Sequence, residues 1–233
     1  MGLEDKLGDR ESKGLARKAL GLGFKAALAA GATAFSLATV GALGPIVGGA
    51  LGGGVALGGI IKKKPLYDIV NNSLRAYTAV NAVLHPIIWL GDVTLPLIPN
   101  ETIFGKLART AYAATGYNAA FVGAFNAAEH LYDNNLNPRG IVKSIKDNFY
   151  NKWKRIGLVF LPGYALVANG FASLPILGYN VPTFAANALP AGFYNTVNPV
   201  PVAKKQSNPV VGDSNPSKVS HMPRLNYAKQ NAA

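Results

Sequence analysis

The chain has 233 residues, of which 15% are charged, against ~25% in ordinary soluble domains. Lysine and arginine number 23 and aspartate and glutamate 11, so the net charge is +12. The sequence holds no cysteine, which excludes disulfides, thiolate catalysis and metal sites with cysteine ligands.

Uncharged tracts determine the architecture that we predict. Residues 26–61 and 156–203 hold no charged side chain, and the shorter tracts 76–91 and 110–128 follow the same pattern. A helix that crosses the ~30 Å hydrocarbon core of a bilayer needs about 20 mostly apolar residues. We therefore predict an all-α, multi-pass transmembrane bundle of four to six membrane helices within residues 26–197.

The first uncharged tract is too long for a single pass, because its 36 residues would extend about 54 Å as one helix. Gly44-Pro45 divides the tract, and a proline suits the first turn of a second helix. We predict a hairpin of helices 26–43 and 45–61. The alternative is a re-entrant pair that never reaches the far side of the membrane.

Small residues recur every fourth position along this predicted hairpin. They form two runs, Ala30, Ala34 and Ala38 in the first and Gly44, Gly48 and Gly52 in the second. Four-residue spacing places them on one helix face, and small faces drive helix packing in lipid because no hydrophobic force acts there between helices. We predict that these six residues pack helices. They do so either within the hairpin or as a glycine zipper between subunits that forms a ring or pore.

The later membrane helices are less regular. The segment 76–91 is short and contains Pro86 near its middle. The segment 110–128 carries hydroxyl and amide side chains, which must face protein or water rather than lipid. The last tract has room for two passes, 156–174 and 176–197, although prolines in the second leave open whether it spans the membrane.

Basic residues are distributed unevenly between the connecting segments. With six passes, the four positive segments, 1–25, 62–75, 129–155 and 198–233, fall on one side of the membrane, whereas the neutral segment 92–109 falls on the other. This alternation is the positive-inside pattern. It predicts that both termini lie on the basic, cytoplasmic or interior side.

Three basic regions are predicted to contact lipid or partners. Residues 1–25 form a basic amphipathic N-terminal segment, and 141–155 is either a similar interfacial helix or a solvated one. The tail 198–233 is rich in proline and asparagine, is expected to be extended, and offers basic contacts to anionic lipid or nucleic acid. The side chains predicted to contact lipid head groups or a partner are Lys62, Lys63, Lys64, Lys152, Lys154 and Arg155.

Residues for catalysis or metal binding follow no recognisable pattern. His85, His130 and His221 are far apart, and the chain lacks the zinc-protease, phosphate-loop and serine-hydrolase motifs. We therefore expect a protein that is not an enzyme and that needs no cofactor or metal ion.

A weak signature follows Asn148. Its residues are, in order, Trp153, Pro162, Asn169, Phe171, Pro175, Tyr179 and Phe193-Tyr194-Asn195. This order resembles the C-terminal signature of the Mpv17/PMP22 family of small multi-pass organelle membrane proteins. The spacings differ by a residue or more, and Leu161 and Asn180 replace the family's tryptophan and arginine. The resemblance implies a channel or a role in membrane homeostasis and assigns no functional residue.

These features favour a non-enzymatic integral membrane protein that packs as a structural component of a larger assembly, either a membrane-bearing virion or a membrane protein complex. Its expected partners are the lipid membrane and other subunits, in a homo- or hetero-oligomer. One alternative is a channel whose pore is lined by the small-residue helices. Another is a peripheral pore-former that is soluble before it inserts.

Overall fold

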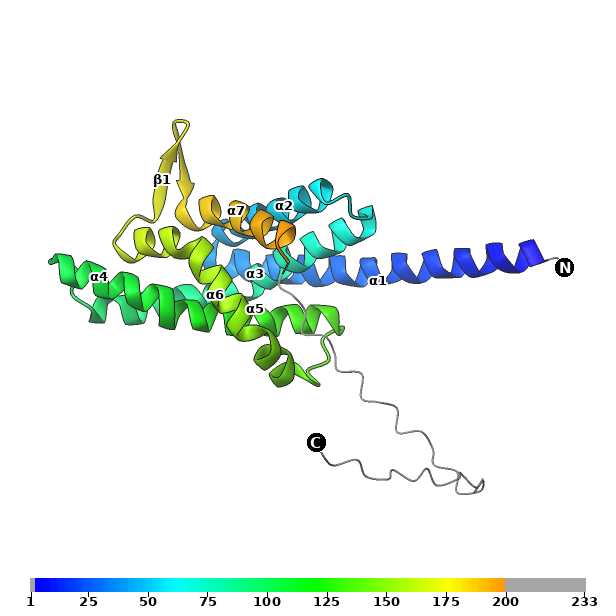
Figure 1. Ribbon diagram of the computed structural model, residues 1–233, viewed down its shortest axis with the longest axis horizontal. Coiled ribbons are helices and arrows are strands. Elements are labelled where there is room, and N and C mark those ends of the chain that lie inside the picture. Colours follow the sequence, from blue (N-terminus) through cyan, green and yellow to red (C-terminus); the bar gives the residue numbers. More distant parts are fainter. Residues whose placement is uncertain (1–2, 200–233) are drawn as a thin grey trace, which may run out of the picture. The chain divides into compact units, whose positions relative to one another are not determined.

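The computed structural model describes residues 3–199, which fold into helices and one β-hairpin (Figure 1). The α-helices are α1 (Leu3–Val40), α2 (Leu43–Ile61), α3 (Leu66–Thr94), α4 (Ile103–Tyr112), α5 (Asn118–Asp133), α6 (Ile141–Ala168) and α7 (Thr183–Val197). A 3-10 turn, η1 (Leu95–Leu97), follows α3, and a π-helix, η2 (Ala113–Tyr117), joins α4 to α5. The predicted helical class is confirmed for this part of the chain, whereas the predicted tail from residue 200 onward lies outside the described residues.

Three stretches of helix are long and apolar enough to cross a membrane: Lys18–Val40, Leu43–Ile61 and Leu66–Leu97. They cover the predicted hairpin and the predicted pass 76–91, and Pro86 lies inside α3 without ending it. The other predicted passes do not meet the same criteria, so the count of four to six membrane helices remains a prediction.

The turn between α1 and α2 lies at Gly41, not at Gly44-Pro45 as predicted. Gly41 has φ +62°, the left-handed conformation in which glycine commonly ends a helix. Pro45 falls in the first turn of α2, where its missing N–H interrupts no helical hydrogen bond. Helix α1 also continues from Leu3 through residue 25, so the predicted N-terminal segment and the first membrane helix are one helix.

The region 173–182 forms a β-hairpin rather than part of a membrane helix. Helix α6 ends at Ala168, and β1 (Ser173–Ile176) pairs antiparallel with β2 (Tyr179–Pro182). The predicted helix over 176–197 is therefore wrong in its first part. The rest of that segment is α7, whose 15 residues extend only about 22 Å, less than the ~30 Å hydrocarbon core.

The helices alternate between two ends of the bundle. Arg75, near the start of α3, pairs with Asp133 at the end of α5, and Gly91, near the end of α3, packs against Tyr117 at the end of η2, directly before α5. The turns α2–α3 and α5–α6 therefore share one end, which we call the basic end. The connections α1–α2, η1–α4 and α6–α7 share the other, which we call the neutral end.

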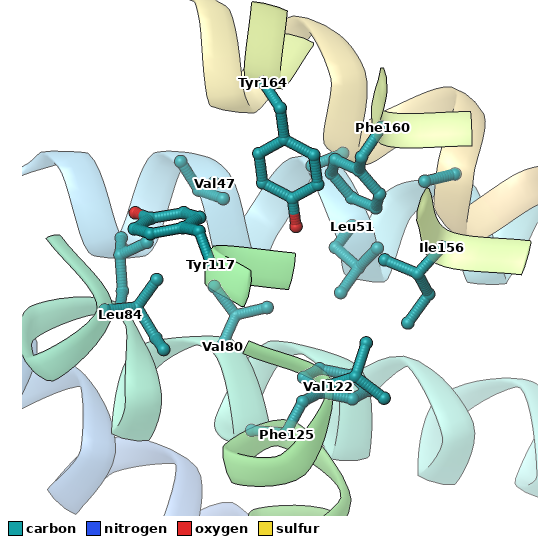
Figure 2. Packing of buried hydrophobic residues seen from close by; sticks show 14 of the residues in the cluster. Val47, Leu51, Val80, Leu84, Tyr117, Val122, Phe125, Ile156, Phe160 and Tyr164 are labelled. Atoms are coloured by element: carbon teal, nitrogen blue, oxygen red, sulfur yellow. The ribbon is translucent and has the colours of Figure 1, made fainter. Parts of the chain in front are cut away.

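The core lies where α2, α3, η2, α5, α6 and α7 meet. Val80 of α3 and Val122 of α5 are almost completely buried, and aliphatic and aromatic side chains fill the space around them (Figure 2). Some of the polar side chains in 110–128 point into this core. Asn118 is fully buried, donates to the Trp153 carbonyl at 3.1 Å and accepts from the Tyr164 hydroxyl at 3.3 Å.

Candidate functional site

The first packing face of α2 contains the three predicted glycines, and all three are buried. A Cβ on Gly48 would lie 2.5 Å from Nδ2 of Asn81, and one on Gly52 would lie 3.1 Å from a carbonyl oxygen of α3. A Cβ on Gly44 would lie 1.6 Å from Oγ of Ser36 in α1. A Cβ at Gly44 or Gly48 would thus overlap a polar side chain of α1 or α3, and one at Gly52 would be in tight contact with the α3 backbone.

A second face of α2 packs against the backbone of α7. A Cβ on Gly54 would lie 2.0 Å from the Leu189 carbonyl oxygen, and one on Gly58 would lie 2.7 Å from Cβ of Thr196. The contact is reciprocal, because a Cβ on Gly192 of α7 would lie 2.3 Å from a carbonyl oxygen of α2. The two backbones are therefore in direct contact along this face.

The predicted alanines of α1 are placed differently. Ala30, Ala34 and Ala38 are all exposed. The buried side of α1 includes Ala29, and Thr33, on the same side, shares a 2.8 Å hydrogen bond with the Tyr77 hydroxyl of α3. One residue along a helix is a rotation of about 100°, so the alanine stripe faces away from the contact with α3.

Two further glycines of α2 point outward. Gly49 and Gly53 are exposed, and a Cβ on either would meet no atom of the described chain within 4 Å. They are four residues apart and so share one helix face. Within the described residues, Gly44, Gly48 and Gly52 thus pack against other helices of the same chain, whereas Gly49 and Gly53 lie on its outer surface.

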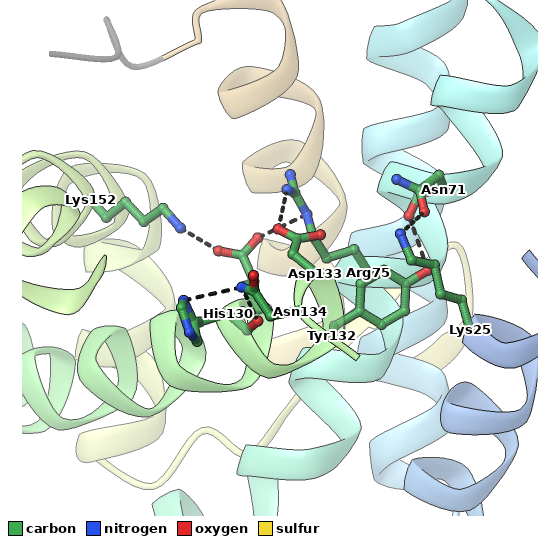
Figure 3. Close-up of polar contacts among 9 residues, drawn as sticks. Lys25, Asn71, Arg75, His130, Tyr132, Asp133, Asn134 and Lys152 are labelled. Atoms are coloured by element: carbon green, nitrogen blue, oxygen red, sulfur yellow. Dashed lines mark hydrogen bonds and ion pairs between the residues drawn. The ribbon is translucent and has the colours of Figure 1, made fainter. Parts of the chain in front are cut away.

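A charged cluster ties three helices together near the basic end (Figure 3). Glu129 of α5, whose side chain is 13% exposed, pairs with Arg75 of α3 at 3.4 Å and with Lys152 of α6. Arg75 also donates from Nη1 to Oδ2 of Asp133 at 3.1 Å. The Glu129 carboxylate is therefore the shared anion between two cations from different helices.

Helix α1 joins this cluster through Lys25. Its ammonium donates to Oδ1 of Asn71 at 2.8 Å and lies 4.9 Å from the centroid of the Tyr132 ring, a cation–π distance. The Tyr132 hydroxyl donates to the Asn71 carbonyl at 3.4 Å. Burial, with the nearby Asp133 carboxylate, raises the pKa of Tyr132 to about 12, so the phenol keeps its proton and remains a donor.

The predicted contact residues Lys62, Lys63 and Lys64 form the turn between α2 and α3, which we call the lysine turn. The backbone N–H of Lys62 donates to the Gly58 carbonyl and closes α2, and Lys63 adopts φ +52°. The side chains of Lys62 and Lys63 are exposed. The lysine turn therefore presents positive charge at the basic end.

The other three predicted contact residues lie on α6 and differ in their surroundings. Lys152 pairs with Glu129 inside the charged cluster, whereas Lys154 is exposed. Arg155 donates from Nη1 to the Asn198 carbonyl just after α7. Of these three residues, Lys154 alone is exposed and has no hydrogen bond or ion pair within residues 3–199.

The histidines are not brought together. The His85 ring packs edge-on against Phe35, with centroids 6.2 Å apart, and Nε2 of His130 lies 3.0 Å from the Arg139 carbonyl oxygen. His221 lies outside the described residues. Across residues 3–199, no group of three or more histidine, cysteine, aspartate or glutamate side chains is placed to hold a metal ion.

The sequence patterns did not lead us to predict a role for Gly192 or Glu129. A packing role for Gly192 could have been predicted locally, since the small residue Ala188 lies four positions before it, and both are buried on α7. Glu129 carries no comparable signal, because its cationic partners are far away in the sequence and are brought to it only by the fold.

No protein-family model, no curated protein and no solved structure matches this chain. The resemblance to the Mpv17/PMP22 signature therefore stays a prediction.

Proposed function

We propose that the protein is a non-enzymatic integral membrane protein that packs as a structural component of a larger membrane assembly, such as a membrane-bearing virion or a membrane protein complex. The observation that carries this proposal is the outer surface of the three span-length helices. Leu37 of α1, Leu57 of α2 and Trp89 of α3 are about half exposed or more. Exposing such side chains to water costs about 25 cal/mol per Å², whereas lipid solvates them.

The distribution of charge supports the proposed orientation. The segments 62–75 and 129–155 each carry a net charge of +3, and both connect helices at the basic end. The segment 92–109 at the neutral end carries no net charge. The positive-inside rule then puts the basic end on the cytoplasmic or interior side.

The outward small residues support the proposed assembly. Because Gly44, Gly48 and Gly52 already pack within the chain, they are not the surface that joins subunits. Gly49 and Gly53 lie on the outer face of α2, and small residues on a lipid-facing helix allow close approach of a neighbouring helix. We assign the contact between subunits to this face.

The alternative of a channel needs several copies of the chain. The interior of the described bundle is filled by side chains such as Val80, Val122 and Phe160 (Figure 2). A pore would therefore lie between subunits, lined by outward small faces. Ion flux through purified protein in liposomes tests this alternative, and a structural component is expected to give no flux above that of empty vesicles.

Membrane integration itself is tested by alkaline carbonate extraction of membranes that carry the full chain. The protein is expected to remain in the membrane pellet, because its span-length helices are solvated by acyl chains. Release into the supernatant would contradict the proposal and would favour the peripheral pore-former.

The assignment of the subunit contact predicts a separation between neighbouring glycines. Gly49→Leu and Gly53→Leu are expected to weaken self-association in mild detergent by about tenfold, or ~1.4 kcal/mol. The helix content should stay unchanged, because a side chain at either site meets open space. Size-exclusion chromatography with light scattering measures the oligomer.

The matched control is Gly48→Leu, one residue away on the inner face. It is expected to disrupt the fold itself, because a Cβ there already meets Asn81 and Tyr77. An unchanged oligomer in the Gly49 and Gly53 variants would contradict the assigned contact and leave membrane integration standing.

A further inference from the structure

The β-hairpin carries an apolar face that the helices cover only in part. Strand alternation puts Leu174, Ile176, Tyr179 and Val181 on one face, and the register pairs Leu174 with Val181 and Ile176 with Tyr179. The pair at the base is half-buried. The pair near the tip is more exposed, with Ile176 40% and Tyr179 76% exposed, and Figure 1 shows the hairpin standing away from the helices.

The tip of the hairpin has an unusual residue. Leu177 and Gly178 both have positive φ, +51° and +82°, as a two-residue type I′ turn requires. Asparagine or aspartate is the usual choice at the first of these positions, because the left-handed region is unfavourable for a bulky side chain. Here a leucine occupies it and is 93% exposed. In water, both the left-handed backbone of this leucine and the exposure of its apolar side chain are energetically unfavourable.

A second apolar surface lies at the same end, on α4. Ile103, Phe104 and Leu107 point outward, with Phe104 80% exposed. The opposite side of α4 is fixed to the neutral end, because Arg109 donates from Nη1 to the Ala168 carbonyl at the end of α6. The hairpin leaves the fold a few residues after Ala168, so both apolar surfaces belong to the neutral end.

The chemistry of these surfaces matches the interfacial layer of a bilayer. No charged residue occurs between Arg155 and Lys204, so the hairpin has no group that must remain in bulk water. Tyr179 has an apolar ring and a polar hydroxyl, which suits the head-group region. Trp89 and Val93 near the end of α3 and Leu97 of η1 are also exposed.

We propose that the hairpin tip, residues 176–179, and the outward face of α4 insert into the interfacial layer of the lipid bilayer at the neutral end. The inference rests on the proposed membrane integration. Lipid would cover the exposed half of the hairpin's apolar face and would stabilise a two-stranded hairpin that is marginal in water.

The chain offers a direct test because it has no cysteine. Leu177→Cys, labelled with the fluorophore NBD, is reconstituted as the full chain in vesicles of phosphatidylcholine and phosphatidylglycerol. The label is expected to emit at a shorter wavelength than in water, to be quenched by nitroxide-bearing lipid and to be protected from aqueous iodide. Phe104→Cys is expected to behave in the same way.

Leu136→Cys is the matched control. Leu136 is also exposed and has positive φ, +66°, but it lies in the α5–α6 turn at the basic end, between Asn135 and Asn137. Its label is expected to be quenched by iodide and not by nitroxide lipid. The comparison therefore separates a general effect of labelling an exposed leucine from insertion at the neutral end.

Two results would overturn the inference. Equal access of iodide to the labels at 177 and 136 would show that the tip lies in water. A shift to shorter wavelength that is lost on dilution of the protein in lipid, without nitroxide quenching, would show that a second copy covers it. If either occurs in a chain that resists carbonate, the proposed function stands, whereas release by carbonate overturns both.

Discussion

Gly192→Ala is expected to lower the free energy of unfolding by about 3 kcal/mol, at the upper end of overpacking effects. The new Cβ would lie 2.3 Å from the Leu51 carbonyl oxygen and 3.0 Å from the Val55 nitrogen. Both atoms belong to the backbone of α2, so they cannot move aside as a flexible side chain would. The only relief is separation of α7 from α2, which opens a gap along the whole contact. Unfolding in mixed micelles with increasing SDS, followed by circular dichroism, measures the change.

The matched pair for this prediction lies on α2. Gly54→Ala is expected to be as unfavourable as Gly192→Ala, because its Cβ would lie 2.0 Å from the Leu189 carbonyl oxygen. Gly53→Ala should stabilise the dissociated monomer by about 0.5–1 kcal/mol, because alanine is the better helix former and the site is open within the single chain. Equal effects at positions 53 and 54 would contradict the close contact between α2 and α7.

The double variant Gly54→Ala/Gly192→Ala tests whether both substitutions destabilise the protein by separating α2 from α7. Gly54 and Gly192 lie in the same α2–α7 contact, so the helices that have already separated for one new methyl group need to move less for the second. The combined loss of stability should therefore be smaller than the sum of the two single losses. A strictly additive result would indicate that each substitution acts on its own helix and not on the contact between them.

Local patterns predicted the first half of the fold well. The uncharged tract 26–61 and its four-residue glycine spacing are properties of neighbouring residues, and the hairpin of α1 and α2 follows from them. The same spacing does not predict which of the two runs of small residues faces another helix. Ala34 and Gly48 belong to two runs with the same four-residue spacing, yet the first is exposed and the second buried. The reason is that the rotation of each helix depends on side chains such as Thr33 that bond to another helix.

The second half was predicted less well because absence of charge does not distinguish a helix from a strand. The hairpin is encoded locally by Leu177-Gly178 between Ile176 and Tyr179, a glycine-containing pair flanked by residues that favour strands. This signal covers only a few residues, far fewer than the about 20 of a membrane span. The charged cluster was missed for another reason, since the pairing of Arg75 with Glu129 exists only once α3 and α5 are packed.

Removal of the shared anion is expected to have the largest effect within the charged cluster. Glu129→Ala should lower the free energy of unfolding by about 2–4 kcal/mol, because the loss of one partner leaves the cations Arg75 and Lys152 partly buried without it. The Glu129 side chain is only 13% exposed, so water does little to replace the lost contacts. The same SDS titration of the purified chain measures this change.

Asp133→Asn is the control within the same cluster. The Asp133 side chain is 41% exposed and contacts Arg75 alone among the cations of the described chain. Exposed ion pairs contribute roughly 0–1 kcal/mol, and Arg75 keeps Glu129 when Asp133 is neutralised. The substitution should therefore change stability by less than about 1 kcal/mol.

The third member of the series decides whether Glu129 acts as a shared anion or simply as one half of an ion pair. Lys152→Met removes one cation but leaves Glu129 paired with Arg75, and the long methionine side chain keeps apolar contact near Phe125. The loss should therefore lie between those of Asp133→Asn and Glu129→Ala. If Lys152→Met costs as much as Glu129→Ala, the pair of Glu129 with Arg75 contributes nothing, and α3 is held to α5 by the Arg75–Asp133 pair and by apolar packing.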